Sequence, residues 1–203
     1  MASVYDLKPR FQALLRPMVG VLYRAGVTAN HVTISALLFS ILYGISVGIT
    51  QQPAWLLLMP VVLFIRMALN AIDGMLAREF NQKSDLGCFL NELSDVIADA
   101  ALYLPFLLFV PGYEWLIWTF VSLSILSEYS GVVAVMIGKS RRYDGPFGKS
   151  DRATFMSVLA LLIGLRWIAL PWIVGLMAVA SLLAAYTSVR RIQRALQAER
   201  NLV

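Results

Sequence analysis

A long uncharged segment near the N-terminus constrains this chain more than any other feature. Residues 25–65 contain no Lys, Arg, Asp or Glu. A helix needs about 20 consecutive apolar residues to cross the hydrocarbon core of a membrane, so this segment is long enough for two crossings. Across the whole chain 59% of residues are hydrophobic and 14% are charged, against about a quarter charged in soluble domains. The sequence therefore predicts an integral membrane protein.

Apolar runs and polar breaks predict an all-α fold, a single domain of residues 1–203 with six transmembrane helices. The expected spans are residues 32–50, 54–78, 87–110, 113–138, 151–168 and 171–190. Basic and apolar residues mix along residues 4–24, a pattern typical of an amphipathic helix at a membrane surface. We therefore expect an interfacial segment (1–30), a six-helix bundle (32–190) and a cytoplasmic tail (191–203).

The positive charges predict the orientation of the chain. Of the 17 Lys and Arg residues, all except Arg66 and Arg166 fall in the N-terminal segment, the second and fourth loops or the tail. The positive-inside rule then places both termini in the cytoplasm, which agrees with an even number of spans. The net charge of +5 thus serves topology and contact with anionic membrane lipids, so nucleic acid is not an expected partner.

Acidic residues interrupt the expected spans. Those inside the spans or at their ends are Asp73, Glu92, Asp95, Asp99 and Glu128. A charged side chain at the centre of a span costs roughly 3 kcal/mol on insertion scales, so such residues usually face the bundle interior and bind or move something. The alternative is structural pairing with an Arg. Arg66 or Arg78 would serve Asp73 and Asp95, and the bases of the fourth loop would serve Glu128.

The spacing of polar side chains on two neighbouring spans indicates a metal site. Asn91, Asp95 and Asp99 recur every four residues and so share one helix face, while Asn70 lies one turn before Asp73 on the preceding span. Hard oxygen ligands favour Mg²⁺ or Mn²⁺. We expect one or two such ions, with ligands drawn from Asn70, Asp73, Asn91, Glu92, Asp95 and Asp99.

The stretch from Asn70 to Asp95 resembles the signature of the CDP-alcohol phosphotransferase family. That signature reads D-x-x-D-G-x-x-A-R, eight residues, then G-x-x-x-D-x-x-x-D. The chain matches it at Asp73, Gly74, Ala77, Arg78, Gly87 and Asp95. Residues 27–33 resemble the family's short P-N-x-x-T segment, with Ala29 in place of proline, and Gly148-Lys149 resembles its basic acceptor-side segment.

This resemblance implies a transfer reaction in the bacterial inner membrane, catalysed by a homodimer. A CDP-alcohol, commonly CDP-diacylglycerol, loses CMP while its phosphoryl group passes to an acceptor alcohol, and two divalent metals clamp the pyrophosphate. Asp95 is the implied general base. The implied CDP-binding residues are Asn30, Thr33, Asn70, Asp73, Gly74, Ala77, Arg78 and Gly87. The alternative explanation for the two glycines and Ala77 is tight helix packing, which small residues also permit.

The chain departs from the family signature at two of its four aspartates, which are Asn70 and Asn91 here. Three hypotheses follow. Glu92 or Asp99 restores the missing charge and catalysis continues, which we favour. Otherwise, one metal binds and the activity or substrate differs, or the chain binds a CDP-lipid as a subunit without turnover. A small transporter is the alternative from another functional class, although no inverted repeat of broken spans supports it.

Basic residues near the fifth span are candidates for the acceptor site. We expect Arg142, Lys149 and Arg152 to bind the acceptor or a phosphate, since five basic residues fall within residues 139–152. The alternative is that they only set the topology. His31, the single histidine, is expected to hydrogen-bond at a helix start rather than to act as a base.

Overall fold

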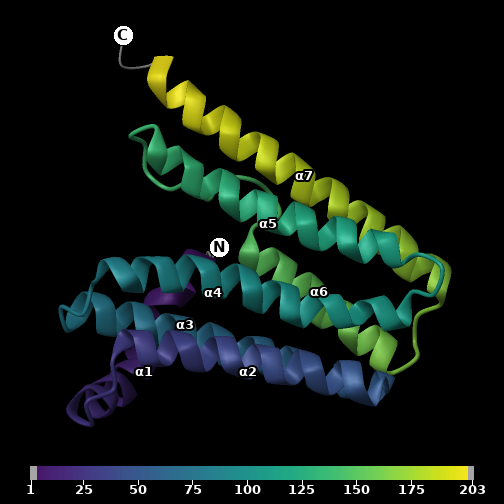
Figure 1. The fold of residues 1–203 in the computed structure, drawn as a ribbon, viewed down its shortest axis with the longest axis horizontal. Coiled ribbons are helices and arrows are strands. Elements are labelled where there is room, and N and C mark those ends of the chain that lie inside the picture. The colour runs from purple at the N-terminus through teal and green to yellow at the C-terminus, as the bar shows by residue number, and fades with distance from the viewer. Residues whose placement is uncertain (1–3, 201–203) are drawn as a thin grey trace. The chain divides into compact units, whose positions relative to one another are not determined.

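A computed structural model describes the backbone of residues 4–200 and the side chains of residues 11–197. Within that range the chain is helical and forms no strand, as the sequence predicts (Figure 1). The helices, with two 3₁₀ segments marked η, are α1 (Val4–Arg24), α2 (Ala29–Thr50), η1 (Pro53–Leu58), α3 (Met59–Glu79), α4 (Asp85–Tyr103), η2 (Leu104–Phe109), α5 (Glu114–Met136), α6 (Lys149–Gly164) and α7 (Leu170–Arg200).

Four helical segments of the described chain are long and apolar enough to cross a membrane. They are Ala29–Thr50, Pro53–Glu79, Glu114–Met136 and Leu170–Gln197. The two other expected spans, 87–110 and 151–168, correspond to α4 with η2 and to α6. Helix α6 has only 16 residues, and α4 carries the acids described above, so neither passes the same test. The count of six spans therefore stays a prediction.

The outward faces of the candidate spans are apolar. On α2 the side chains of Leu42 and Ile49 are 63% and 76% exposed, and on α7 those of Trp172 and Leu182 are 73% and 71% exposed. Large apolar side chains in such numbers on helix surfaces are typical of contact with lipid rather than with water. The helices that pass the length test thus also have surfaces suited to a membrane.

The chain divides into two compact units, each made from separate stretches of sequence. The first comprises Met1–Tyr43 and Val61–Asp99, and the second comprises Gly44–Pro60 and Ala100–Val203. The boundaries between the two units fall within α2, close to the start of α3 and within α4. The expectation of one domain over residues 1–203 stays a prediction.

In the first unit, α1 packs against the core of α2 and α3. Leu15 and Val19 lie one turn apart on α1 and are buried with apolar residues of the other two helices. The guanidinium of Arg16 donates to both carboxylate oxygens of Glu79, at 3.2 and 3.0 Å, and so ties α1 to the end of α3. The opposite apolar stripe of α1, which includes Leu14, is exposed. Contact of that stripe with a membrane surface stays a prediction.

Helix α2 begins with a reciprocal cap between Thr28 and His31. The His31 backbone N–H donates to the Thr28 hydroxyl at 3.2 Å, and the Thr28 backbone N–H donates to Nδ1 of His31 at 3.3 Å. The two bonds satisfy amide groups near the first turn of the helix, where the helix itself provides no acceptor. The predicted helix-start role of His31 is confirmed.

The second unit is built around α5 and α7, which run alongside each other (Figure 1). The loop before α6 lies against α7, where the Phe147 backbone N–H donates to the Thr187 hydroxyl at 3.1 Å. Gly145 in this loop has a φ of +114°, and a Cβ at that position would lie 2.6 Å from the methyl group of Thr187. Only glycine suits both the backbone conformation and the close approach.

We expect Gly145→Ala to destabilise the protein by about 1–3 kcal/mol, because the added methyl both strains the backbone and collides with Thr187. The unfolding temperature in detergent, followed by tryptophan fluorescence, would fall. Gly175→Ala is the matched control. Gly175 lies inside α7, and a Cβ added there would have no neighbouring atom within 4 Å, so alanine should be neutral or stabilising. Equal unfolding temperatures for both variants would contradict this account of the loop.

Candidate active site

Two of the acids on α4 meet on one guanidinium group. Arg66 on α3 donates from Nη1 to Oδ1 of Asp99 on α4 at 2.5 Å. Its Nη2 donates to the backbone carbonyl of Asp95 at 3.0 Å and contacts Oδ1 of Asp95 at 3.4 Å. The Arg66 side chain is 4% exposed. A buried cation therefore stands between the two acids, as the pairing alternative anticipated for Asp95.

Asn70 reinforces the same contact one turn further along α3. Its side-chain amide donates to Oδ1 of Asp95 at 3.0 Å. An ionised aspartate at position 70 has no proton to donate and would repel the Asp95 carboxylate. Asparagine at the first signature position thus joins α3 to α4 by a direct hydrogen bond.

Asp73 is held from α2. The Thr33 hydroxyl lies 2.8 Å from Oδ2 of Asp73 and 3.0 Å from the Ala29 carbonyl, so its single proton is shared between the two acceptors. Both Thr33 and Asp73 are buried. A residue of the P-N-x-x-T-like segment therefore orients a signature carboxylate directly.

The small signature residues have close neighbours within the same unit. A Cβ on Gly74 would lie 3.1 Å from the guanidinium of Arg78, and one on Gly87 would lie 3.0 Å from the side-chain oxygen of Asn30. Ala77 packs against the apolar core that α1, α2 and α3 share. The glycines leave room for the polar side chains of Arg78 and Asn30, and the expected contacts of these residues with a nucleotide stay predictions.

Asn91 and Glu92 are the two remaining candidate metal ligands of the sequence analysis. Both lie on α4 ahead of Asp95 and are half-buried. The Asn91 backbone carbonyl accepts a weak hydrogen bond from the Ser94 hydroxyl at 3.3 Å. Their expected role as metal ligands, and the compensation that we expected from Glu92 or Asp99, stay predictions.

The second unit contains a separate buried ion-pair cluster centred on Glu128 of α5. The Glu128 carboxylate accepts hydrogen bonds from Arg152 at 2.8 Å, Arg141 at 3.2 Å and Arg191 at 3.3 Å. The side chains of Arg152 and Arg191 are 0% and 2% exposed. The pairing alternative for Glu128 is confirmed, and the cluster holds more positive than negative charge.

The two other expected acceptor-site residues lie nearby in the sequence but in different settings. Arg142 forms a two-bond ion pair with Asp144, at 2.8 and 3.0 Å. Lys149 is the first residue of α6, directly after Gly148, whose backbone N–H donates to the Asp151 carboxylate at 2.9 Å. Acceptor binding by Arg142, Lys149 and Arg152 stays a prediction.

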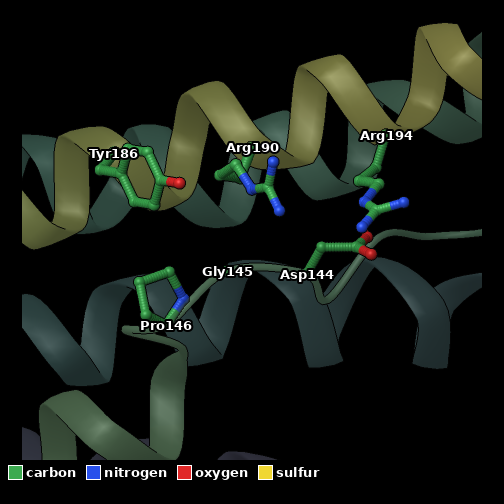
Figure 2. Close-up of a pocket in the computed structure, with 6 residues that line it drawn as sticks. All are labelled: Asp144, Gly145, Pro146, Tyr186, Arg190 and Arg194. Carbon is green, nitrogen blue, oxygen red and sulfur yellow. The ribbon is translucent and has the colours of Figure 1, made fainter.

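A pocket of about 350 Å³ opens beside this loop in the second unit. Figure 2 shows Tyr186, Arg190 and Arg194 on one face of α7 above the loop of Asp144, Gly145 and Pro146. From the sequence, both arginines count only as topology charges. Tyr186, Arg190 and Arg194 recur every four residues, which places all three on one helix face, and this spacing is the signal that could have found them.

Comparison with known proteins identifies the family. The family model described as CDP-alcohol phosphatidyltransferase matches residues 26–184. The chain belongs to the CDP-alcohol phosphatidyltransferase family. It is 46% identical over 194 residues to the inner membrane protein YnbA of Escherichia coli K12, a match that covers 96% of each chain. The expected family is therefore confirmed.

Solved structures with this fold come from a phosphatidylinositol phosphate synthase of Mycobacterium tuberculosis, PgsA1. Its complex with manganese and citrate has a TM-score of 0.74 and 20% identity to this chain, and covers 89% of this chain and 88% of its own. The structure of the same enzyme with CDP-DAG bound has a TM-score of 0.74 and 20% identity, with coverage of 88% and 92%. At this identity the likeness establishes the fold.

The acids of the candidate centre in this CDP-alcohol phosphatidyltransferase family member already have polar partners within the protein. Within the described side chains, no group of three or more His, Cys, Asp and Glu residues is arranged to hold a metal. Asp95 and Asp99 face the Arg66 guanidinium, and Asn70 directs an amide N–H at Asp95. The carboxylates of Asp73 and Asp95, with amide oxygens nearby in the sequence, are hard oxygen donors of the kind that Mg²⁺ or Mn²⁺ prefers.

Proposed function

We propose that this protein is an active CDP-alcohol phosphatidyltransferase. It transfers a phosphatidyl or other substituted phosphoryl group from a CDP-alcohol, CDP-diacylglycerol in the first instance, to an acceptor alcohol, and it releases CMP. The observation that carries this proposal is the placement of the two retained signature aspartates and their polar contacts. Asp73 and Asp95 lie on adjacent helices of one unit, and each is oriented by a polar contact from another helix.

In this proposal Asp95 is the general base. As the acceptor oxygen forms its bond to phosphorus, its proton passes to the Asp95 carboxylate, and the bond from phosphorus to the CMP oxygen breaks with its electron pair on CMP. A base positioned in this way typically contributes 10²- to 10⁴-fold to the rate. A bound divalent ion would supply charge stabilisation at the pyrophosphate, with Asp73, Asp95 and Asn91 as its ligands.

The nucleotide is expected beside the small residues of α3 and α4. Gly74 and Gly87 leave close approaches to Arg78 and Asn30, respectively. The Arg78 guanidinium carries a permanent charge and planar donors that suit a phosphate. We therefore assign the donor site to Asn30, Thr33, Asn70, Asp73, Gly74, Ala77, Arg78 and Gly87.

The acceptor is expected in the second unit, near Arg142, Lys149 and Arg152. Around Glu128, three guanidinium groups face one carboxylate, which leaves two positive charges in excess in a mostly buried cluster. Such an excess favours an anionic group, so the proposal extends to an acceptor alcohol that carries a phosphate. We further propose a homodimer in the bacterial inner membrane, with both termini in the cytoplasm.

One observation favours a second candidate function. Arg66 and Asn70 both contact Oδ1 of Asp95, so this oxygen already has two donor groups beside it and is less available to an acceptor hydroxyl. A CDP-lipid-binding subunit with little or no turnover would tolerate such contacts.

The deciding experiment is an assay of CMP release by the purified protein in mixed detergent–lipid micelles. The reactions contain CDP-diacylglycerol, Mg²⁺ or Mn²⁺, and one of a panel of acceptor alcohols with and without a phosphate group. We expect acceptor-dependent CMP release that stops on chelation of the metal. Absence of release from protein that still binds CDP-diacylglycerol would overturn the proposal in favour of the binding subunit.

Thr33→Val tests the link from α2 to Asp73. The substitution keeps the shape of the side chain and removes the hydrogen bond to Oδ2 of Asp73. A hydrogen bond to a charged group contributes about 1.5–3 kcal/mol, so we expect kcat/KM for CMP release to fall roughly 10- to 100-fold. Thr50→Val is the control on the same helix, because the Thr50 hydroxyl contacts only carbonyls of its own turn. Equal losses in both variants would show that Thr33 has no special role.

A further inference from the structure

The buried guanidinium of Arg66 is the least expected group at this centre. A cation at 4% exposure is costly inside a protein unless anions surround it. Here it contacts carboxylate oxygens of Asp95 and Asp99 and the Asp95 backbone carbonyl. Its planar, permanently charged fork can hold these oxygens together in a fixed geometry. Arg66 thus makes the kind of multiple oxygen contact that a metal ion makes.

The charges around Arg66 also account for the departures from the family signature. The full signature has four aspartates, whose charge two divalent ions balance. In this chain Asp73, Asp95 and Asp99 provide three negative charges, and Arg66 offsets one of them. Glu92 on α4 would add one negative charge and Arg78 on α3 one positive charge, so counting both leaves the balance unchanged. A single divalent ion would balance the remaining two negative charges. A second ion would leave two positive charges in excess at a buried site, where unbalanced charge is strongly unfavourable.

Asn70 completes the arrangement. It lies one turn after Arg66 on α3, and both side chains reach the same oxygen of Asp95. An aspartate at position 70 would add a fourth carboxylate and lose the hydrogen bond to Asp95. The asparagine is therefore suited to a centre that already contains a cation.

We propose that Arg66 is a resident cation that takes the place of one of the two metal ions, so that this centre binds a single divalent ion. The inference deepens the proposed function and rests on it for the role of the centre. The number of bound ions, however, is measurable without turnover.

The first test counts Mn²⁺ ions on the full chain in micelles, by titration calorimetry and by electron paramagnetic resonance. We expect one ion per chain and a spectrum without coupling between manganese ions. Two ions per chain with a coupled spectrum, or no bound ion at all, would overturn the inference. A protein that binds one ion and releases no CMP would support this inference while contradicting the proposed function. CMP release with two bound ions would do the reverse.

The second test restores the signature charges. In the double variant Arg66→Gln with Asn70→Asp, four carboxylates remain and the resident cation is gone, so we expect two Mn²⁺ ions per chain and a coupled spectrum. Arg66→Lys keeps a cation and should still bind one ion, as should Arg24→Gln, an exposed control at the end of α1. A double variant that remains at one ion contradicts the inference. If the double variant does not fold, the numbers of Mn²⁺ ions bound by the wild type and by Arg66→Lys still decide whether the centre binds one ion.

Discussion

Asp95→Asn is expected to lower the rate of CMP release by about 10³-fold or more, with little change in the amount of folded protein. The substitution removes the base that accepts the proton from the acceptor alcohol, a role that contributes up to about 10⁴-fold in comparable reactions. It keeps the oxygen that accepts hydrogen bonds from Asn70 and Arg66, at 3.0 and 3.4 Å, so the contact between α3 and α4 persists.

The measurement is kcat for CMP release at saturating donor and metal, together with the unfolding temperature. Asp85→Asn is the matched control, because Asp85 is an exposed acid at the start of the same helix and lies outside the cluster. Its activity should equal that of the wild type. Turnover by Asp95→Asn within a few-fold of the wild-type value would refute the assignment of Asp95 as the base.

Glu128→Leu is expected to destabilise the protein by about 3–5 kcal/mol. The change leaves the guanidinium groups of Arg141, Arg152 and Arg191 without the carboxylate that they share. Removal of one partner from a buried ion pair is far more damaging than loss of an exposed pair, because the remaining charge stays desolvated. Little folded protein, or a much lower unfolding temperature in detergent, is the expected result.

A double variant separates this electrostatic cause from simple loss of packing. Glu128→Leu combined with Arg152→Met removes the most deeply buried of the three cations as well, so part of the lost stability should return. The control on the same helix is Glu114→Gln, an exposed change in its first turn that should cost about 1 kcal/mol or less. If Glu128→Leu unfolded at the wild-type temperature, the cluster would have no structural importance.

Much of the secondary structure follows from local sequence. The prediction of a helix over residues 4–24 agrees with α1 at both ends, and the expected span 32–50 lies within α2. Apolar periodicity and turn residues act over a few positions, so one sequence is enough to locate such elements. The fifth expected span is the main difference, because α6 ends at Gly164 and a turn with Arg166 at a φ of +57° follows it.

The signature likewise locates the candidate site, but not the partners of its side chains. The family and the retained aspartates, Asp73 and Asp95, could be read directly from the spacing of a few residues. Arg66 entered only as one possible ion-pair partner, because its place beside Asp95 and Asp99 depends on how α3 packs against α4. For Glu128 the sequence indicated only pairing with some base of the fourth loop, and the choice of Arg152 and its complete burial depend on how α5, α6 and α7 pack.

The sequence by itself determined that this chain is helical, that it is apolar enough for a membrane and that it belongs to its family, since composition, periodicity and motif spacing are properties of the chain alone. Only the tertiary structure decided which charges meet. Helix packing brings the cation of Arg66 to the acids of α4, and brings three arginines to Glu128. The strength of each contact depends on distance and burial, which arise when helices distant in sequence pack together.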